Sequence, residues 1–227
     1  LPADATLAFE LKRFEASSGK ARASGTLQAR RDAAGAWTVK SDGTLQSFDV
    51  AAWWPAATAG RSSDLNGAWD ADLQLPVRAA SGTSAAASTG TPAGDLLDTL
   101  RGAADLTLKA STLAGVPLSG KAALKAPGRG LRLEADLQVA ANTLRLKGGM
   151  AAGQHDWRAE VEAPALAALA PLLALVSPTV PAAQGWAPSA GTLQASATAN
   201  GRWPALRSEG RLQLNTLRTP QLQLDQG

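Results

Sequence analysis

The chain has 227 residues, of which 45% are hydrophobic, and its 22 Lys and Arg against 19 Asp and Glu give a formal net charge of +3. This length suits one large domain or two smaller ones, and the lack of cysteine excludes disulfides, thiol catalysis and cysteine-based metal sites. No basic run or cluster of arginines with aromatic residues indicates nucleic acid, and no apolar stretch is long enough to predict a membrane-spanning helix.

Polar and apolar residues alternate with a period of two along most of the chain. In 131–139 (LRLEADLQV), Leu131 and Leu133 fall on one face, and Arg132 and Glu134 fall on the other. Successive side chains of a strand point to opposite faces, so this pattern predicts strands with one apolar and one polar face. Strands are predicted at 5–11, 21–30, 36–40, 43–48, 67–78, 104–110, 119–126, 129–139, 142–148, 155–162, 190–200, 206–215 and 220–225.

Three segments of the N-terminal half interrupt the alternation. Residues 42–43 (Asp-Gly) predict a turn between two strands. Asp49 followed by 50–54 predicts one capped helical turn that ends before Pro55. Segment 79–94 contains only Ala, Ser, Gly, Thr and Pro, a composition that predicts a flexible loop because it offers little apolar surface to bury.

Two further segments predict helices. Residues 95–101 (DLLDTLR) predict a short amphipathic helix that begins at a capping aspartate. The strongest helical signal is 163–176, where Leu166 and Leu169 follow helical spacing and Pro171 should kink or split the helix.

These elements predict an all-β fold: an elongated, curved, mostly antiparallel open sheet that forms a U-shaped groove, with short helices at 95–101 and 163–176. Residues 1–78 and 95–227 are expected to form one continuous sheet on either side of the 79–94 loop. Ala and Leu supply most of the apolar residues, against three Phe and seven Trp, so few bulky side chains are present to fill a closed interior. A closed sandwich with an ordinary core is the alternative.

Few residues suggest catalysis or metal binding. His155, the only histidine, is expected on the surface of a polar turn, and Asp70 and Asp72 are expected to alternate on a solvated strand face. The pair Trp53 and Trp54 suits packing of a helical turn against the sheet better than a binding platform. We therefore expect neither an enzyme nor a cofactor or metal site.

The apolar face is the remaining candidate site. If it lines a groove for an apolar ligand, phospholipid acyl chains are the expected occupant, because a smooth wall of Leu, Ala and Val shields hydrocarbon from water. The residues predicted to line this groove are Leu106, Leu108, Leu131, Leu133, Leu137, Val139, Leu144, Leu146, Leu193, Leu212, Leu214, Leu222 and Leu224. The residues predicted to face water are Lys109, Arg132, Glu134, Asp136, Arg145 and Arg211.

Residues 163–227 resemble the repeats of the TamB family, the translocation and assembly module subunits of the AsmA-like superfamily. The sequence pattern of the family consists of a Leu- and Pro-containing helix, a gap, and then strands with regularly placed glycine and leucine. The matching residues are Leu166, Leu169, Pro171, Gly191, Leu193, Gly201, Pro204, Gly210, Leu212, Leu217, Leu222 and Leu224. An earlier stretch, 45–75, is similar to the same pattern of a helix followed by a strand, whereas segment 79–94 departs from the family pattern.

The resemblance, rather than the composition, implies a cellular role. Members of the family cross the periplasm of Gram-negative bacteria from an inner-membrane anchor, form a U-shaped "β-taco" sheet, and work with the outer-membrane barrel protein TamA. They are linked to phospholipid transport between the two membranes and to assembly of outer-membrane proteins. The chain is thus expected to be an internal segment of such a bridge, in contact with membranes only through parts outside it. The alternative role is a chaperone-like scaffold that offers sheet edges to nascent barrel strands.

Overall fold

The computed structural model describes residues 6–53, 61–75, 100–176, 188–202, 205–219 and 223–226. Strands account for 77% of the structure, and the described helices are short. The strands are β1 (Leu7–Ser18), β2 (Ala21–Arg31), β3 (Trp37–Phe48), β4 (Ser63–Leu75), β5 (Arg101–Leu113), β6 (Val116–Pro127), β7 (Leu131–Val139), β8 (Asn142–Ala151), β9 (Gln154–Ala163), β10 (Ala190–Arg202), β11 (Ala205–Arg218) and β12 (Gln223–Gln226). The helical segments are α1 (Val50–Trp53), the 3-10 helix η1 (Leu166–Leu169) and α4 (Ala170–Val176).

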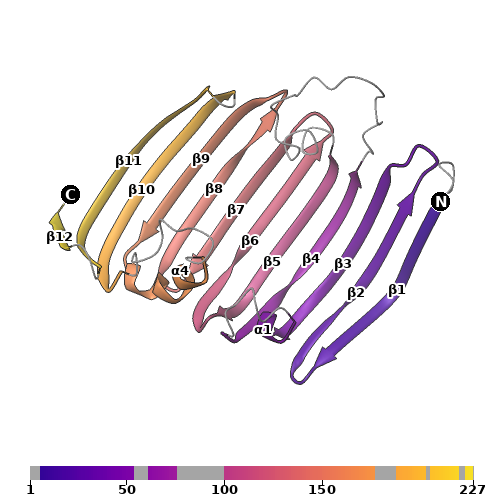
Figure 1. Ribbon diagram of the computed structural model, residues 1–227, viewed down its shortest axis with the longest axis horizontal. Coiled ribbons are helices and arrows are strands. Elements are labelled where there is room, and N and C mark those ends of the chain that lie inside the picture. Colours follow the sequence, from indigo (N-terminus) through magenta and orange to yellow (C-terminus); the bar gives the residue numbers. More distant parts are fainter. Residues whose placement is uncertain are drawn as a thin grey trace, which may run out of the picture.

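The twelve strands form one open antiparallel sheet in which every strand pairs with its neighbours in sequence (Figure 1). Tight turns connect several neighbours: Ala114 and Gly115, both with positive φ (52° and 78°), join β5 to β6. At a spacing of about 4.8 Å between strands, the sheet measures about 53 Å from β1 to β12. The sequence-based prediction of a continuous, open, antiparallel sheet is confirmed.

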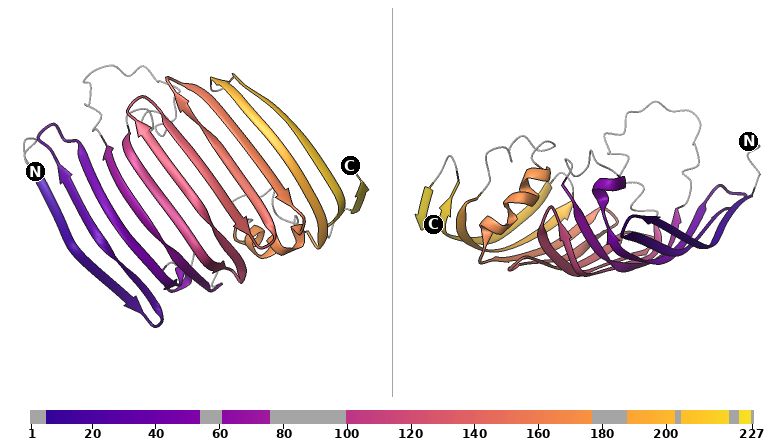
Figure 2. Two further views of the ribbon diagram at one scale, coloured as in Figure 1. Left: turned by 180° about the vertical axis from the view of Figure 1, so that it is seen from behind. Right: turned by 90° about the horizontal axis from the view of Figure 1, so that it is seen from below.

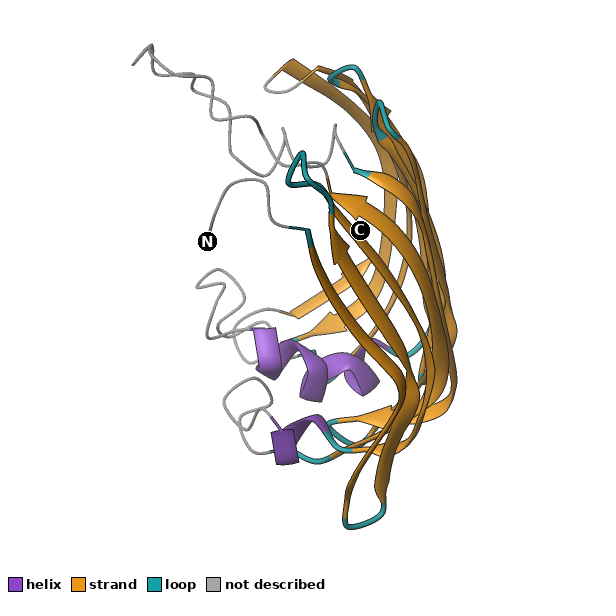
Figure 3. Ribbon diagram, turned by 90° about the vertical axis from the view of Figure 1, so that its right-hand side faces the viewer, coloured by secondary structure: helices purple, strands orange, loops and turns teal. Residues whose placement is uncertain are grey.

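The sheet is a trough with one concave and one convex face, and the helical segments lie on the concave side near one end of the strands (Figures 2 and 3). Pairing registers shift between Leu11 and Phe14 in β1 and between Leu45 and Phe48 in β3. Further shifts follow between Asp64 and Gly67 in β4 and between Leu108 and Ser111 in β5. Such β-bulges bend strands and increase their twist, and this series contributes to the curvature of the trough.

The predicted helical turn after Asp49 forms as α1, while its predicted end at residues 54–55 lies outside the described residues. The Asp49 carboxylate accepts hydrogen bonds from the backbone N–H of Ala51 (3.0 Å) and from the backbone N–H and hydroxyl of Ser63 (2.9 and 3.1 Å). The Ser63 hydroxyl in turn accepts a bond from Val50 N–H (2.7 Å). Hydrogen bonding, first from the Ser63 backbone, lowers the pKa of Asp49.

The predicted helix at 163–176 forms in two parts. Ala163 still belongs to β9, the first helical turn is the 3-10 helix η1, and α4 begins at Ala170, directly before Pro171. Proline cannot donate a backbone hydrogen bond, so it suits the start of a helix better than its interior. The predicted split at Pro171 therefore takes the form of a change of helix type.

Two other predictions need correction. The turn predicted at 42–43 is wrong, since both residues lie inside β3, which replaces the two strands predicted at 36–40 and 43–48. Of the helix predicted at 95–101, residues 95–99 lie outside the described residues, and Arg101 begins β5 instead of ending a helix. The loop predicted at 79–94 also lies outside the described residues.

The packed core is thin. One buried cluster joins Leu100, Ala126 and Leu131. In a second cluster, Leu166 of η1 packs against Ala163 and Leu217 of the sheet. No large side chain of the described residues is less than 2% exposed. The sheet therefore has no second layer over most of its apolar face within the described part of the chain.

Candidate functional site

Cross-strand pairing places the apolar residues of successive strands on one face. The row of direct neighbours from β4 to β10 is Trp69, Leu106, Ala122, Ala135, Leu146, Ala159 and Ala197. Leu193 and Leu214 share this face, and both pack against Leu166 of η1 or its buried neighbours. Because the helical segments lie on the concave side (Figure 3), this row marks the concave face of the trough.

The sequence-predicted groove residues occupy this concave face. The register brings together Leu106, Leu108, Leu131, Leu133, Leu137, Val139, Leu144, Leu146, Leu193, Leu212 and Leu214, and Leu224 is the direct neighbour of concave-face Leu217. Leu222 lies outside the described residues. Their contact with lipid stays a prediction.

Many large apolar side chains of this face are exposed. Leu212 is 68% exposed, Phe9 is 50% exposed and Leu7 is 46% exposed, although their alternation matches that of a buried strand. Single exposed apolar residues are common on proteins, but a continuous apolar surface of this kind marks a binding face.

An apolar hollow of about 250 Å³ lies near the middle of the concave face. Its side chains come from four neighbouring strands, β4 to β7, and include Trp69, Ala71, Ala104, Leu106, Ala122, Leu124 and Leu133. The small side chains of Ala104 and Ala122 leave this space between the larger Trp69, Leu106 and Leu133. Asp70 and Asp105 also border the hollow, at strand positions that the register assigns to the convex face. The apolar side chains that line the hollow can accept a stretch of hydrocarbon.

The helical segments lie at one end of the trough. Arg61, just before β4, donates a hydrogen bond to the carbonyl oxygen of Pro171 in α4 (2.9 Å), so the segments that follow β3 and β9 meet there. Asn142 holds the start of η1: its side-chain amide donates to the carbonyls of Val139 and Ala165 (3.0 and 3.1 Å) and accepts from Ala165 N–H (3.0 Å). The opposite end of the strands carries no helical segment in the described residues (Figure 1).

The convex face is charged. The register places Arg132, Glu134, Asp136, Arg145 and Arg211 there, as predicted. Lys109 is exposed, but it lies in the β5 bulge, where the pairing register skips it.

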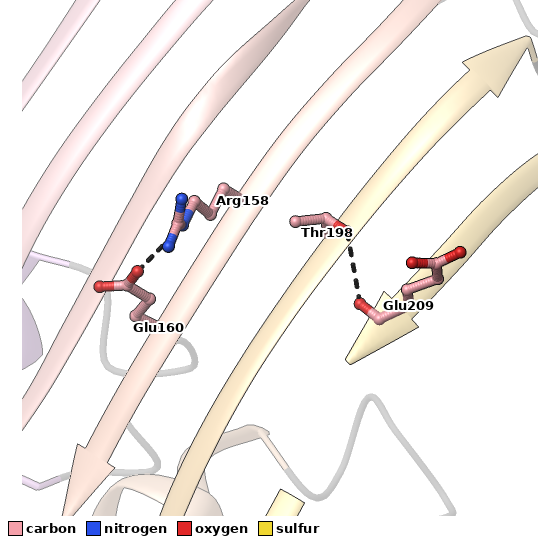
Figure 4. A network of polar contacts seen from close by, with 4 residues as sticks. All are labelled: Arg158, Glu160, Thr198 and Glu209. Carbon is pink, nitrogen blue, oxygen red and sulfur yellow. Dashed lines mark hydrogen bonds and ion pairs between the residues drawn. The ribbon is translucent and has the colours of Figure 1, made fainter. Parts of the chain in front are cut away.

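Ion pairs link neighbouring positions on the convex face. Lys147 pairs with Glu134 (2.9 Å), and this hydrogen-bonded ammonium lowers the pKa of Glu134. Arg158 pairs with Glu160 (2.9 Å), while Thr198 donates a long hydrogen bond to the Glu209 carbonyl (3.5 Å; Figure 4). These groups are exposed or half-buried, so the ion pairs contribute little to stability and mainly keep this face solvated.

The residues considered for catalysis and metal binding are dispersed. His155 was expected on the surface of a polar turn, but it lies in β9 on the concave face and accepts a hydrogen bond from Trp157 Nε1 (3.4 Å). Asp72 pairs with Lys40 (2.7 Å) on the convex face. Trp54 lies outside the described residues. Within the described ranges, no group of three or more His, Asp or Glu side chains could hold a metal ion.

Sequence reasoning missed one concave-face residue, Arg31. The register pairs it with Leu7 and Trp37, both on the apolar face. The signal was present in the sequence, because Leu27, Ala29 and Arg31 share one phase of β2.

Comparisons of the chain with protein-family models, with curated proteins and with solved structures find no match. None of the described helices has the length and apolar character needed to cross a membrane.

Proposed function

We propose that the chain is a segment of a periplasmic bridge of the TamB type, which carries phospholipids between the inner and outer membranes of a Gram-negative bacterium along the concave face of its sheet. The observation that carries this proposal is the continuous, open, apolar concave face of a twelve-stranded sheet. The resemblance of 163–227 to TamB-family repeats supports it. The proposal is also supported by the position of the helical segments: one follows β3 and another follows β9, and both lie at the same end of the sheet.

Hydrocarbon transfer explains why such a face is useful. At about 0.8 kcal/mol per methylene, keeping an acyl chain of some 16 carbons in water costs on the order of 12 kcal/mol. A continuous apolar trough removes most of this cost without any chemical step. The charged convex face keeps the other side of the sheet in water.

Two neighbouring alanines of β6 offer a matched test. Ala122 lies in the concave hollow, whereas Ala123 faces the convex side opposite Glu134. Ala122→Arg places a cation where hydrocarbon should lie, so we expect it to abolish binding of a fluorescent acyl-chain probe to the purified chain. Ala123→Arg adds the same side chain on the solvated face and should leave binding unchanged.

Thermal unfolding of both variants completes this experiment. Because the concave face is open, the new arginine at position 122 can reach water. Both variants should therefore fold, and both should show a cooperative unfolding transition. A folded Ala122→Arg variant that binds the probe like the parent chain would contradict the proposal. Unfolding of the Ala122→Arg variant alone would instead identify the concave face as an ordinary core.

The second candidate is a scaffold for nascent outer-membrane barrel strands. Its supporting observation is the outer edge of β1, which has no strand partner among the described residues and carries the exposed Leu7 and Phe9. An unpaired edge can accept an added strand through backbone hydrogen bonds. This role predicts capture of polypeptide at β1, whereas lipid carriage predicts capture of lipid on the concave face.

A further inference from the structure

Arg31 is an exception to the pattern of the concave face. Among the described strand residues that the cross-strand register assigns to this face, it is the only Lys, Arg, Asp or Glu. Its direct neighbours are Leu7 in β1 and Trp37 in β3, and Leu75 of β4 follows Trp37 in the same row. The guanidinium group of arginine is a cation, so this apolar face carries a positive charge at one place.

The guanidinium group of Arg31 lacks a partner within the described residues. Its Nε is buried without a hydrogen bond, and the side chain forms no ion pair with the described part of the chain. The adjacent carboxylate of Asp32 is already engaged in the following turn, where it accepts a bond from Ala36 N–H (2.9 Å). A desolvated donor on a charged group is unfavourable unless an acceptor from beyond the described residues reaches it.

The position of Arg31 suits a headgroup. It is the last residue of β2, at the end of the sheet opposite α1 and α4. From there Trp37 and Leu75 lead across the next two strands toward Leu73 and the apolar hollow, which begins at β4, about 10 Å from β2. A cation at one end and an apolar surface beyond it match an amphiphile with an anionic head.

We propose that Arg31 anchors the phosphate group of a lipid whose acyl chains lie on the concave face and point toward the helical end of the trough. This inference rests on the proposed lipid-carrying function and specifies its substrate class as phosphate-bearing lipids held in one orientation. The planar guanidinium can donate two parallel hydrogen bonds to phosphate oxygens, a geometry that a lysine cannot supply.

The test uses calorimetric titration of the purified chain with dioctanoyl phosphatidic acid, dioctanoylglycerol and inorganic phosphate. Arg31→Gln should weaken binding of phosphatidic acid by about tenfold or more, since it removes charge-assisted hydrogen bonds. It should leave binding of dioctanoylglycerol, which lacks phosphate, unchanged. Arg30→Gln is the matched control, because Arg30 is adjacent and exposed on the convex face and the variant loses the same charge.

Each result decides between the possibilities. Equal binding of phosphatidic acid by the parent chain and Arg31→Gln would overturn the anchor but leave the lipid-carrying face intact. Equal weakening by Arg30→Gln would show general attraction of anions, and tight binding of inorganic phosphate alone would show a free-phosphate site; both also overturn the anchor. If the parent chain bound neither lipid, the proposed function itself would fail.

A conservative variant covers the case in which Arg31→Gln does not fold. Arg31→Lys keeps the positive charge but loses the two-pronged donor, so it should still bind phosphatidic acid more weakly than the parent chain. Unchanged binding by a folded Arg31→Lys would contradict a bidentate phosphate contact.

Discussion

At the scale of single residues, glycines of the strands make room for the aromatic rings of the concave face. Trp69 lies across Gly43, its neighbour in β3, donates its indole N–H to the Ser41 hydroxyl (3.0 Å), and stacks on Phe14 with ring centroids 6.3 Å apart. Trp157 lies over Gly148 in the same way. Glycine in a strand often marks such a close approach of another group.

Gly43→Val tests this arrangement. A Cβ atom at position 43 would overlap two ring carbons of Trp69 and would lie 2.5 Å from the Ser24 carbonyl oxygen. Because neither the ring nor the backbone can move away freely, we expect a loss of about 1–3 kcal/mol in the free energy of unfolding, measured by urea denaturation. Ala104→Val, which adds methyl groups beside the open hollow of the same face, should cost less. Equal stability of the two variants would show that packing of the Trp69 ring does not require a glycine at position 43.

At the scale of elements, Asn142 ties the start of the helical segment to the sheet. Asn142 is 4% exposed and makes three hydrogen bonds, two of them to Ala165 at the start of η1. Leu166 then packs on Leu217, so polar and apolar contacts fix the segment together.

Asn142→Ala should therefore loosen η1 and α4 while the sheet stays intact. It removes the acceptor of the Ala165 N–H and one donor to each of the Val139 and Ala165 carbonyls, although the Ala165 carbonyl still accepts from Ala168 N–H (3.1 Å). We expect a loss of about 1–3 kcal/mol in the free energy of unfolding. Hydrogen exchange should quicken at 166–176 far more than in β6 and β7. Asn200→Ala, at an exposed position of β10, is the control and should change neither quantity. Unchanged exchange at 166–176 in Asn142→Ala would show that apolar packing alone holds the helical segment.

The strands and helices could be predicted from the sequence where local patterns alone determine them. Alternation placed the strands and separated Leu133 from Glu134, because a strand has a fixed period of two. The turn predicted at 42–43 was wrong because Gly43 has a different role there. It leaves space for the ring of Trp69, a residue 26 positions away in the sequence, and this contact cannot be seen in the local Asp-Gly pattern. Likewise, the bonds from Asn142 to Ala165 and the isolation of Arg31 depend on contacts between strands, which local pattern does not reveal.

At the scale of the whole molecule, the described residues form no second layer over most of the apolar face of the sheet. Antiparallel sheets normally pack one face on a core, whereas here the described helical segments cover only one end of the concave face (Figure 3). Under the proposed function, a mobile occupant, phospholipid, covers this exposed surface in place of a fixed layer of protein.

Photocrosslinking in cells tests whether phospholipid occupies the concave face. A photoreactive amino acid would replace Leu133, on the concave face, or its neighbour Arg132, on the convex face, in the protein as its own cells make it. Mass spectrometry would then identify the captured partners. We expect phospholipid adducts at position 133 and none at position 132. Polypeptide adducts at position 133, or lipid adducts equal at both positions, would contradict it.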